Sequence, residues 1–183
     1  KVGIAGSVAL NIVTLDTTAR IAGGATIAAG TGASSITAAN DVDATATAAP
    51  SDEGVTGGKV GVGASFAMNK LTTTTTAELQ DGATFNAGND LTVEATSGLD
   101  TTTEASAGAA GGIAVDASVA LALLNQTTTA RIGTGNTSNM GAGAIRVAAT
   151  NTGANTATST GENKSGKVGV GASASVILGN GAS

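Results

Sequence analysis

One eleven-residue string recurs along this chain and limits its possible folds more than any other feature. It reads KVGIAGSVALN at residue 1, KVGVGASFAMN at residue 59, GIAVDASVALA at residue 112 and KVGVGASASVI at residue 167. The serines at its centre are Ser7, Ser65, Ser118 and Ser173, which lie 58, 53 and 55 residues apart. A string that returns at a nearly fixed interval indicates an array of stacked supersecondary units.

The interval divides the chain into units of about 55 residues. We predict three whole units and one partial unit: 1–58, 59–111, 112–166 and 167–183. Within the string, small and larger residues alternate with the period of two that is typical of a β-strand. Stacked copies of such a strand would build a core that no unit can bury alone. The predicted fold is therefore all-β, a parallel β-helix (β-solenoid) that forms one continuous array, and no helix is expected.

The alternation also predicts which residues of the lead strand face the core. We place on the inner face the larger set Val60, Val62, Ala64, Phe66 and Met68. The small residues between them, from Gly61 to Ala67, would face outward. Stacking then predicts two inner apolar ladders, one of Val2, Val60, Ile113 and Val168 and one of Val8, Phe66, Val119 and Ala174. The core would be narrow, with the alanines 105, 107 and 109 of a returning strand opposite the larger set.

The remaining segments of each unit follow from the same reasoning. Strand Thr72–Leu79 is predicted with Ala77 and Leu79 inward, and Thr76 and Glu78 outward. A short strand follows at Ala83–Ala87 with Phe85 inward, and then a strand at Leu91–Thr96. Glycine-rich turns separate these strands, and Gly111-Gly112 marks the corner before the next unit. Surface loops are expected at Gly30–Ser34 and at residues 50–54, which include the only proline.

The number of coils in each unit is the least constrained part of the prediction. Similar inward patterns at 60–64 and 91–95 favour two coils of about 27 residues. In that case Arg20, Glu78 and Arg131 would lie nearly 10 Å apart, whereas one coil per unit would stack them about 4.8 Å apart as alternating charges.

Composition excludes several classes of function. The chain has 28 glycines, two phenylalanines and no Tyr, Trp, His or Cys, so stability must come from many small layers rather than from aromatic packing. With a net charge of −5 and no basic cluster, nucleic acid is a poor partner. No apolar run approaches the roughly 20 residues of a membrane span, and the first residues do not resemble a signal peptide. We interpret the chain as a window of a longer protein.

Candidate catalytic groups are limited to carboxylates, because histidine, cysteine and tyrosine are absent. One unit contains six acids, all in predicted outward positions or turns: Glu78, Asp81, Asp90, Glu94, Asp100 and Glu104. A paired-carboxylate glycosidase site is conceivable, but none of the six recurs at all equivalent positions. The simpler interpretation is a solvated surface.

Metal and phosphate sites are equally poorly supported. The turns Asn89-Asp90 and Asn40-Asp41 raise the question of calcium, but the glycine-rich nonapeptide that binds calcium between coils is absent. The glycines also lack the context of a phosphate-binding loop. No catalytic, cofactor-binding or metal-ligating residue is therefore predicted.

Two surfaces remain as candidates for binding. The Thr-rich segment could present regular outward hydroxyls, as in ice-binding solenoids, although Glu78 and Arg131 interrupt it. The small outward residues predicted on the lead strand, such as Gly61, Gly63 and Ser65, would leave a flat surface that another sheet could approach.

The unit KVGVGASFAMNKLTTTTTAELQDGATFNAGNDLTVEAT resembles the repeats of large filamentous bacterial adhesins, the leukotoxin-like and haemagglutinin-like proteins. The resemblance covers essentially the whole chain, although Asp116 departs from it at the position of Gly63. It implies a secreted, cell-surface, non-enzymatic stalk of a β-helical passenger, in a filament or biofilm matrix. Its partners would be neighbouring repeats, copies of itself end to end, or a host or matrix glycan or protein. An ice-binding face and a polysaccharide-processing enzyme are the alternatives.

The ends carry a further expectation. No capping unit is visible beside Lys1 or Ser183, so we expect the terminal strands to be covered by further units or to stack end to end.

Overall fold

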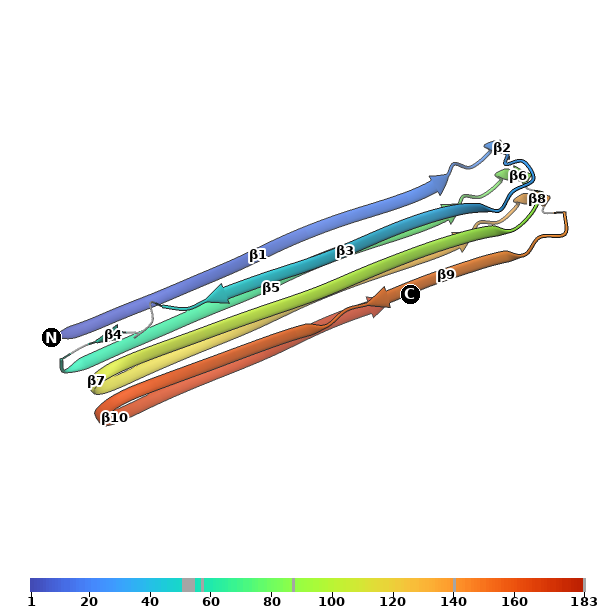
Figure 1. The fold of residues 1–183 in the computed structure, drawn as a ribbon. Coiled ribbons are helices and arrows are strands. Elements are labelled where there is room, and N and C mark those ends of the chain that lie inside the picture. Colours follow the sequence, from blue (N-terminus) through green and yellow to red (C-terminus); the bar gives the residue numbers. More distant parts are fainter. Residues whose placement is uncertain (51–54, 57, 87, 140, 183) are drawn as a thin grey trace.

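The computed structural model describes residues 1–50, 55–56, 58–86, 88–139 and 141–182. It is all-β, with long parallel strands, an arrangement compatible with a β-solenoid (Figure 1). No helix occurs in these ranges, as predicted. Of the two predicted loops, Gly30–Ser34 contains a turn at 30–32 that precedes the next strand, while residues 51–54 of the other lie outside the described ranges.

Ten strands account for most of the described residues. They are β1 (Val2–Ile21), β2 (Thr26–Ala28), β3 (Ser34–Ala48), β4 (Val55–Thr56), β5 (Val60–Leu79), β6 (Thr84–Asn86), β7 (Leu91–Ile132), β8 (Thr137–Asn139), β9 (Ile145–Thr152) and β10 (Asn155–Ala182). Two of them, β7 and β10, reverse direction at a corner part-way along and therefore contribute to both layers of the molecule (Figure 1).

Two layers face each other along most of the molecule. The lead layer contains residues 2–21, 60–79, 113–132 and 168–182, which pair in that order through β1, β5, β7 and β10. The return layer contains residues 34–48, 91–110, 145–152 and 155–165, which pair through β3, β7, β9 and β10. The short strands β2, β6 and β8 form a third sheet at one end.

The predicted two coils per unit are wrong. Ser65 pairs directly with Ser7 on one side and with Ser118 on the other, so the chain makes one wide circuit before it returns to the same position. The same register places Glu78 between Arg20 and Arg131. Similar alternation in two segments does not imply that they stack, because residues 60–64 and 91–95 lie in opposite layers of the same circuit.

The predicted inner face of the lead strand is also wrong, by one residue. Gly61, Gly63 and Ala67 point inward and are buried, whereas the side chains of Phe66 and Met68 point outward and are only partly covered. Both predicted ladders exist with the predicted register, but they lie on the outer surface. The alanines 105, 107 and 109 do face inward, opposite small residues rather than large ones.

The physical reason is the continuity of β5. The prediction placed the even-numbered Phe66 and the odd-numbered Leu79 on the same inner face, which requires a bulge between them. Strand β5 runs without a break from Val60 to Leu79, so the odd-numbered side stays inside throughout. The predicted inward positions of Leu79, Phe85 and Leu91 are confirmed.

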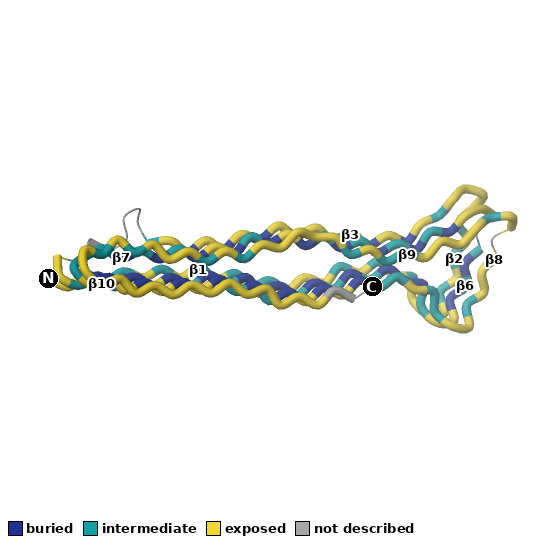
Figure 2. The backbone as a smooth tube through the Cα atoms, turned by 90° about the horizontal axis from the view of Figure 1, so that it is seen from below, coloured by how far each residue is buried: buried dark blue, intermediate teal, exposed yellow. Residues whose placement is uncertain are grey.

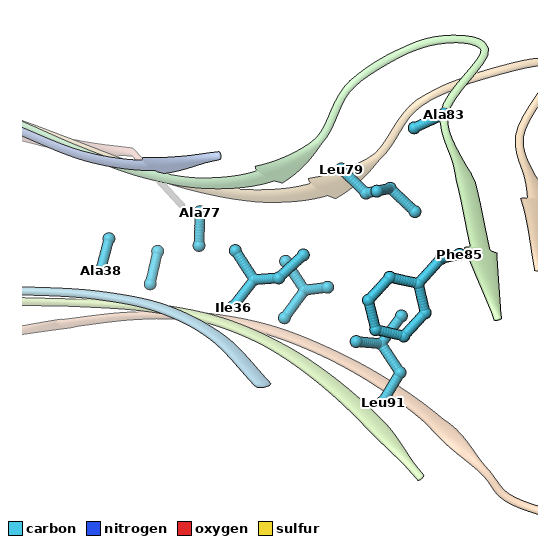
Figure 3. Close-up of a cluster of buried hydrophobic side chains, with 9 residues drawn as sticks. Ile36, Ala38, Ala77, Leu79, Ala83, Phe85 and Leu91 are labelled. Carbon is cyan, nitrogen blue, oxygen red and sulfur yellow. The ribbon is translucent and has the colours of Figure 1, made fainter. Parts of the chain in front are cut away.

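The interior is narrow along the layers and opens at one end (Figure 2). In the narrow part, a Cβ added to Gly63 would overlap the carbonyl oxygen of Gly108 across the core, so only glycine fits there. Toward the third sheet the layers diverge, and larger side chains fill the space (Figure 3). Phe85 points from β6 toward Leu91 and Ile36 and is only 3% exposed.

Candidate functional site: the outward face of the lead layer

The outward face of the lead layer carries an array of large apolar side chains. We call it the apolar strip. Its members are Val2, Ile4, Val8, Leu10, Val60, Val62, Phe66, Met68, Ile113, Val115, Val119, Leu121, Val168, Val170 and Val176. Their exposure reaches 78% at Ile4 in the first circuit, while Val119 in a central strand is 38% exposed. In a soluble domain such residues would ordinarily form the core.

The apolar strip is ridged. The row Gly6, Ala64 and Ala117 runs across three strands between two rows of larger residues, and it forms the floor of a groove of about 310 Å³. Phe66 and Val119 form one wall of this groove. Small residues beside large ones in the first three circuits therefore produce a groove and a ridge that run across β1, β5 and β7, because equivalent residues pair in register; in the last circuit Ala174 stands at the ridge position.

The next outward row still contains three apolar residues and one lysine: Ile12, Lys70, Leu123 and Leu178. Beyond this row the same face becomes polar. Thr72, Thr74 and Thr76 point outward, as predicted for Thr76, and pair with Asn125, Thr127 and Thr129 of the next circuit. This half of the face is a flat array of hydroxyls and amides.

A row of alternating charges ends the polar half of the face. The carboxylate of Glu78 accepts hydrogen bonds from Gln80 Nε2 at 2.7 Å and from Arg131 Nε at 2.8 Å. The hydrogen bond from Gln80 is the main cause that lowers the pKa of Glu78. The hydrogen bond from Arg131 and the charges of Arg131 and Arg20 lower this pKa further, against the opposing effect of burial. This row is the stacked ion ladder expected for one coil per unit.

The other candidate carboxylates are not gathered into a reactive site. Three of them accept a backbone N–H of the next circuit: Asp81 from Thr134 at 2.8 Å, Asp90 from Ala144 at 2.8 Å, and Asp100 from Ala154 at 2.6 Å. Such bonds fasten the turns of adjacent circuits together. Glu94 pairs with Arg146 at 3.1 Å, and Glu104 is exposed.

The structure brings no metal-binding cluster together from these acids. Within the described ranges, no three His, Cys, Asp or Glu residues are close enough to hold an ion. Asn40-Asp41 was expected in a turn, but both residues lie inside β3, because this pair continues the register with Ser97 and Gly98 of β7.

Buried polar side chains that cross the core were missed by the sequence reasoning. Asn69 is fully buried, and its Nδ2 donates to Thr103 Oγ1 at 2.8 Å and to the carbonyl of Thr102 at 2.9 Å. In the next circuit, Gln126 Nε2 donates to the carbonyl of Ser97 at 2.9 Å. The signal was the recurrence of asparagine at the end of the string, where Asn11 and Asn69 are equivalent.

Asp116 is the most unusual buried group. It is 2% exposed and points inward at the position that Gly63 and Gly171 occupy in neighbouring circuits. One carboxylate oxygen accepts a hydrogen bond from Asn163 Nδ2 at 2.9 Å, while Oδ2 has no hydrogen-bond partner. Gly161 leaves room for it across the core. One carboxylate with a single amide neighbour, Asn163, is too few groups to form a metal-binding or catalytic site.

No helix in the described part of the chain is both long and apolar enough to cross a membrane. Comparison with protein-family models, curated proteins and solved structures gives no match.

Proposed function

We propose that this chain is a β-solenoid segment of a secreted, cell-surface bacterial adhesin, where it serves as a non-enzymatic structural element. One observation carries the proposal. Each lead strand pairs residue for residue with the next. From Val60 to Leu79, every residue of β5 therefore lies between the equivalent residues of the preceding and the following circuit. A circuit that pairs equally well above and below can be added without limit, which is what an extended surface structure requires.

The side chains that link the circuits support the same interpretation. The turn aspartates bind backbone N–H groups of the following circuit, and Asn11 Nδ2 donates to Asn69 Oδ1 at 3.0 Å. Ser7 and Ser65 hydroxyls are 3.0 Å apart. These polar groups hold one circuit to the next, and so do five of the six acids considered for glycan hydrolysis, all except Glu104. This favours a structural role over an enzymatic one.

The proposal is tested by lengthening the array. A second copy of residues 59–111, one whole circuit, would be inserted after residue 111, and then several more. Each insert should extend both layers by one strand, so that small-angle scattering shows growth of about 4.8 Å per insert along the stacking direction. An insert of the same composition in scrambled order is the control. Inserts that remain unfolded and protease-sensitive, like the scrambled one, would contradict the proposal.

A second candidate function is ice binding through the polar half of the lead face. The observation that favours it is the outward array in which Thr74 and Thr76 pair with Thr127 and Thr129. The array is narrow, because the charged row at Glu78 ends it. Thermal hysteresis that disappears in Thr74→Val with Thr127→Val would support this function, and its absence in the unmodified chain would exclude it.

A further inference from the structure

The apolar strip covers a large area on one face of the molecule. It spans about ten residues along each strand and the four strands of the lead layer, or roughly 33 Å by 19 Å. Its flat area is therefore about 600 Å² per molecule, which is at the upper limit of the largest apolar patch on a typical monomer. The return layer, by contrast, presents mainly polar residues outward near its centre, such as Asp100, Thr102 and Glu104 of β7. Of the two layers, only the lead layer has an outward face that is apolar enough to be buried in an interface.

The chemistry of the strip argues against a membrane as its occupant. Interfacial segments combine apolar side chains with tryptophan, tyrosine and basic residues at the headgroup level. This chain contains no Trp or Tyr and carries a net charge of −5. Of the two arginines in the charged row, Arg131 forms an ion pair with Glu78, and the charge of Arg20 also acts on this carboxylate. A second sheet with the same properties is a better match, since sheets pack face to face through apolar side chains about 10 Å apart.

We propose that the strip binds the strip of a second copy of this chain. The groove and the ridge dictate how. A two-fold axis in the interface, parallel to the stacking direction and between the rows of Ala64 and Phe66, reverses the strand direction of the partner. The ridge at Phe66, Val8 and Val119 of one copy then enters the groove at Ala64, Gly6 and Ala117 of the other, and the reverse holds by symmetry.

The alternative two-fold axis, along the strands, fits less well. It would place ridge against ridge and groove against groove, which prevents close packing. With the favoured axis, Val62 lies opposite Met68, and Val60 lies opposite the aliphatic part of Lys70 at the edge. Because the axis runs along the stacking direction, each circuit meets the same circuit of its partner. The pairing therefore extends with the array and does not depend on the proposed structural role.

The buried area is sufficient. Two strips of about 600 Å² bury about 1,200 Å² in total, the lower limit of specific interfaces. Each further circuit adds about 160 Å² per copy. A chain of this length should therefore associate reversibly, and longer arrays should associate more tightly.

Sedimentation velocity of the whole chain tests the proposal. We expect a concentration-dependent monomer–dimer equilibrium. Val119→Lys places a charge on the central ridge and should weaken the dimer at least about tenfold, and Ala117→Gln should do so without a charge by filling the groove. Thr127→Lys is the matched control, because it places the same side chain outward on the same strand beyond the strip. Unchanged circular dichroism would show that all variants remain folded.

The register is tested by cross-linking, which is simple because the chain has no cysteine. A mixture of Val62→Cys and Met68→Cys chains should give a mixed dimer with a short thiol-reactive linker. Val60→Cys alone should not, since its two copies would be about 33 Å apart. A chain that stays monomeric at about 100 μM, a dimer equally insensitive to Val119→Lys and Thr127→Lys, or binding to neutral phosphatidylcholine vesicles in place of dimerisation would each overturn the proposal.

Discussion

The two phenylalanines of this chain provide a direct test of which side of the sheets is the interior. Phe85 is 3% exposed and packs against Leu79, Leu91 and Ile36 at the wide end of the core. Phe-to-Ala changes in a core cost about 3–5 kcal/mol through lost burial and the cavity left behind. Because Phe85 pairs with the small Ser138 on one side, its packing is looser there. We therefore expect Phe85→Ala to lower the free energy of unfolding by about 3 kcal/mol.

Phe66→Ala is the matched comparison. Phe66 points outward and pairs in its row with Val8 and Val119, and such cross-strand pairs contribute about 0.2–1 kcal/mol each. The expected loss is about 1 kcal/mol. Urea denaturation followed by far-ultraviolet circular dichroism measures both variants, at a concentration low enough to keep the chain monomeric. If Phe66→Ala lowered the free energy of unfolding more than Phe85→Ala, the face that carries Phe66 would be the interior. The orientation of β5 with Phe66 outward and Gly63 inward would then be refuted.

Three further predictions concern individual side chains. Because folding lowers the pKa of Glu78, its carboxylate stabilises the fold above the ordinary pKa of 4.5, and this stabilisation is lost as the pH falls below that value. Between pH 7 and 3 the melting temperature of Glu78→Gln, which lacks the charge that Arg131 binds, should therefore fall less steeply than that of the unmodified chain. Asp116→Ala removes a buried carboxylate with an unpaired oxygen and should raise the free energy of unfolding by about 1–3 kcal/mol in the same urea assay. Gly63→Ala should cost about 1–3 kcal/mol by overpacking, while Gly6→Ala should cost much less, because a Cβ on Gly6 would make only an ordinary contact of 3.6 Å with the carbonyl oxygen of Ala64.

The register between circuits could be predicted from the sequence because it depends only on recurrence. Aligning Ser7, Ser65 and Ser118 by their common string gives the observed pairing. The segments around Phe85 and Leu91 could also be placed, since there the larger residues do lie inside. In these parts of the chain, alternation and burial agree.

The orientation of the lead strand could not be predicted, because the usual rule that larger apolar residues lie inside fails there. The two layers approach so closely at Gly63 and Gly108 that only small side chains fit between them. The sequence contains one sign of this, a conflict of parity between Phe66 and Leu79, but no single-strand pattern resolves it without knowing that β5 has no bulge. Inward polar groups such as Asn69 looked like surface residues for the same reason.

The inverted lead strand connects the architecture with a role for its surface. Where the layers approach most closely, around Gly63, Ser65 and Ala67, the interior holds only small residues and removes little apolar area from water, so stability there must rest on the backbone ladders and on polar bonds such as those of Asn69. In this part of the lead strands the larger apolar side chains lie outside, as Phe66 and Val119 do, and remain available to another surface. A circuit of about 55 residues lengthens the stack by only about 4.8 Å. Most residues of each unit therefore widen the faces of the two layers and add little to the length of the array. A structure that served reach alone would not need so wide a circuit, whereas one that joins neighbouring molecules along their sides would.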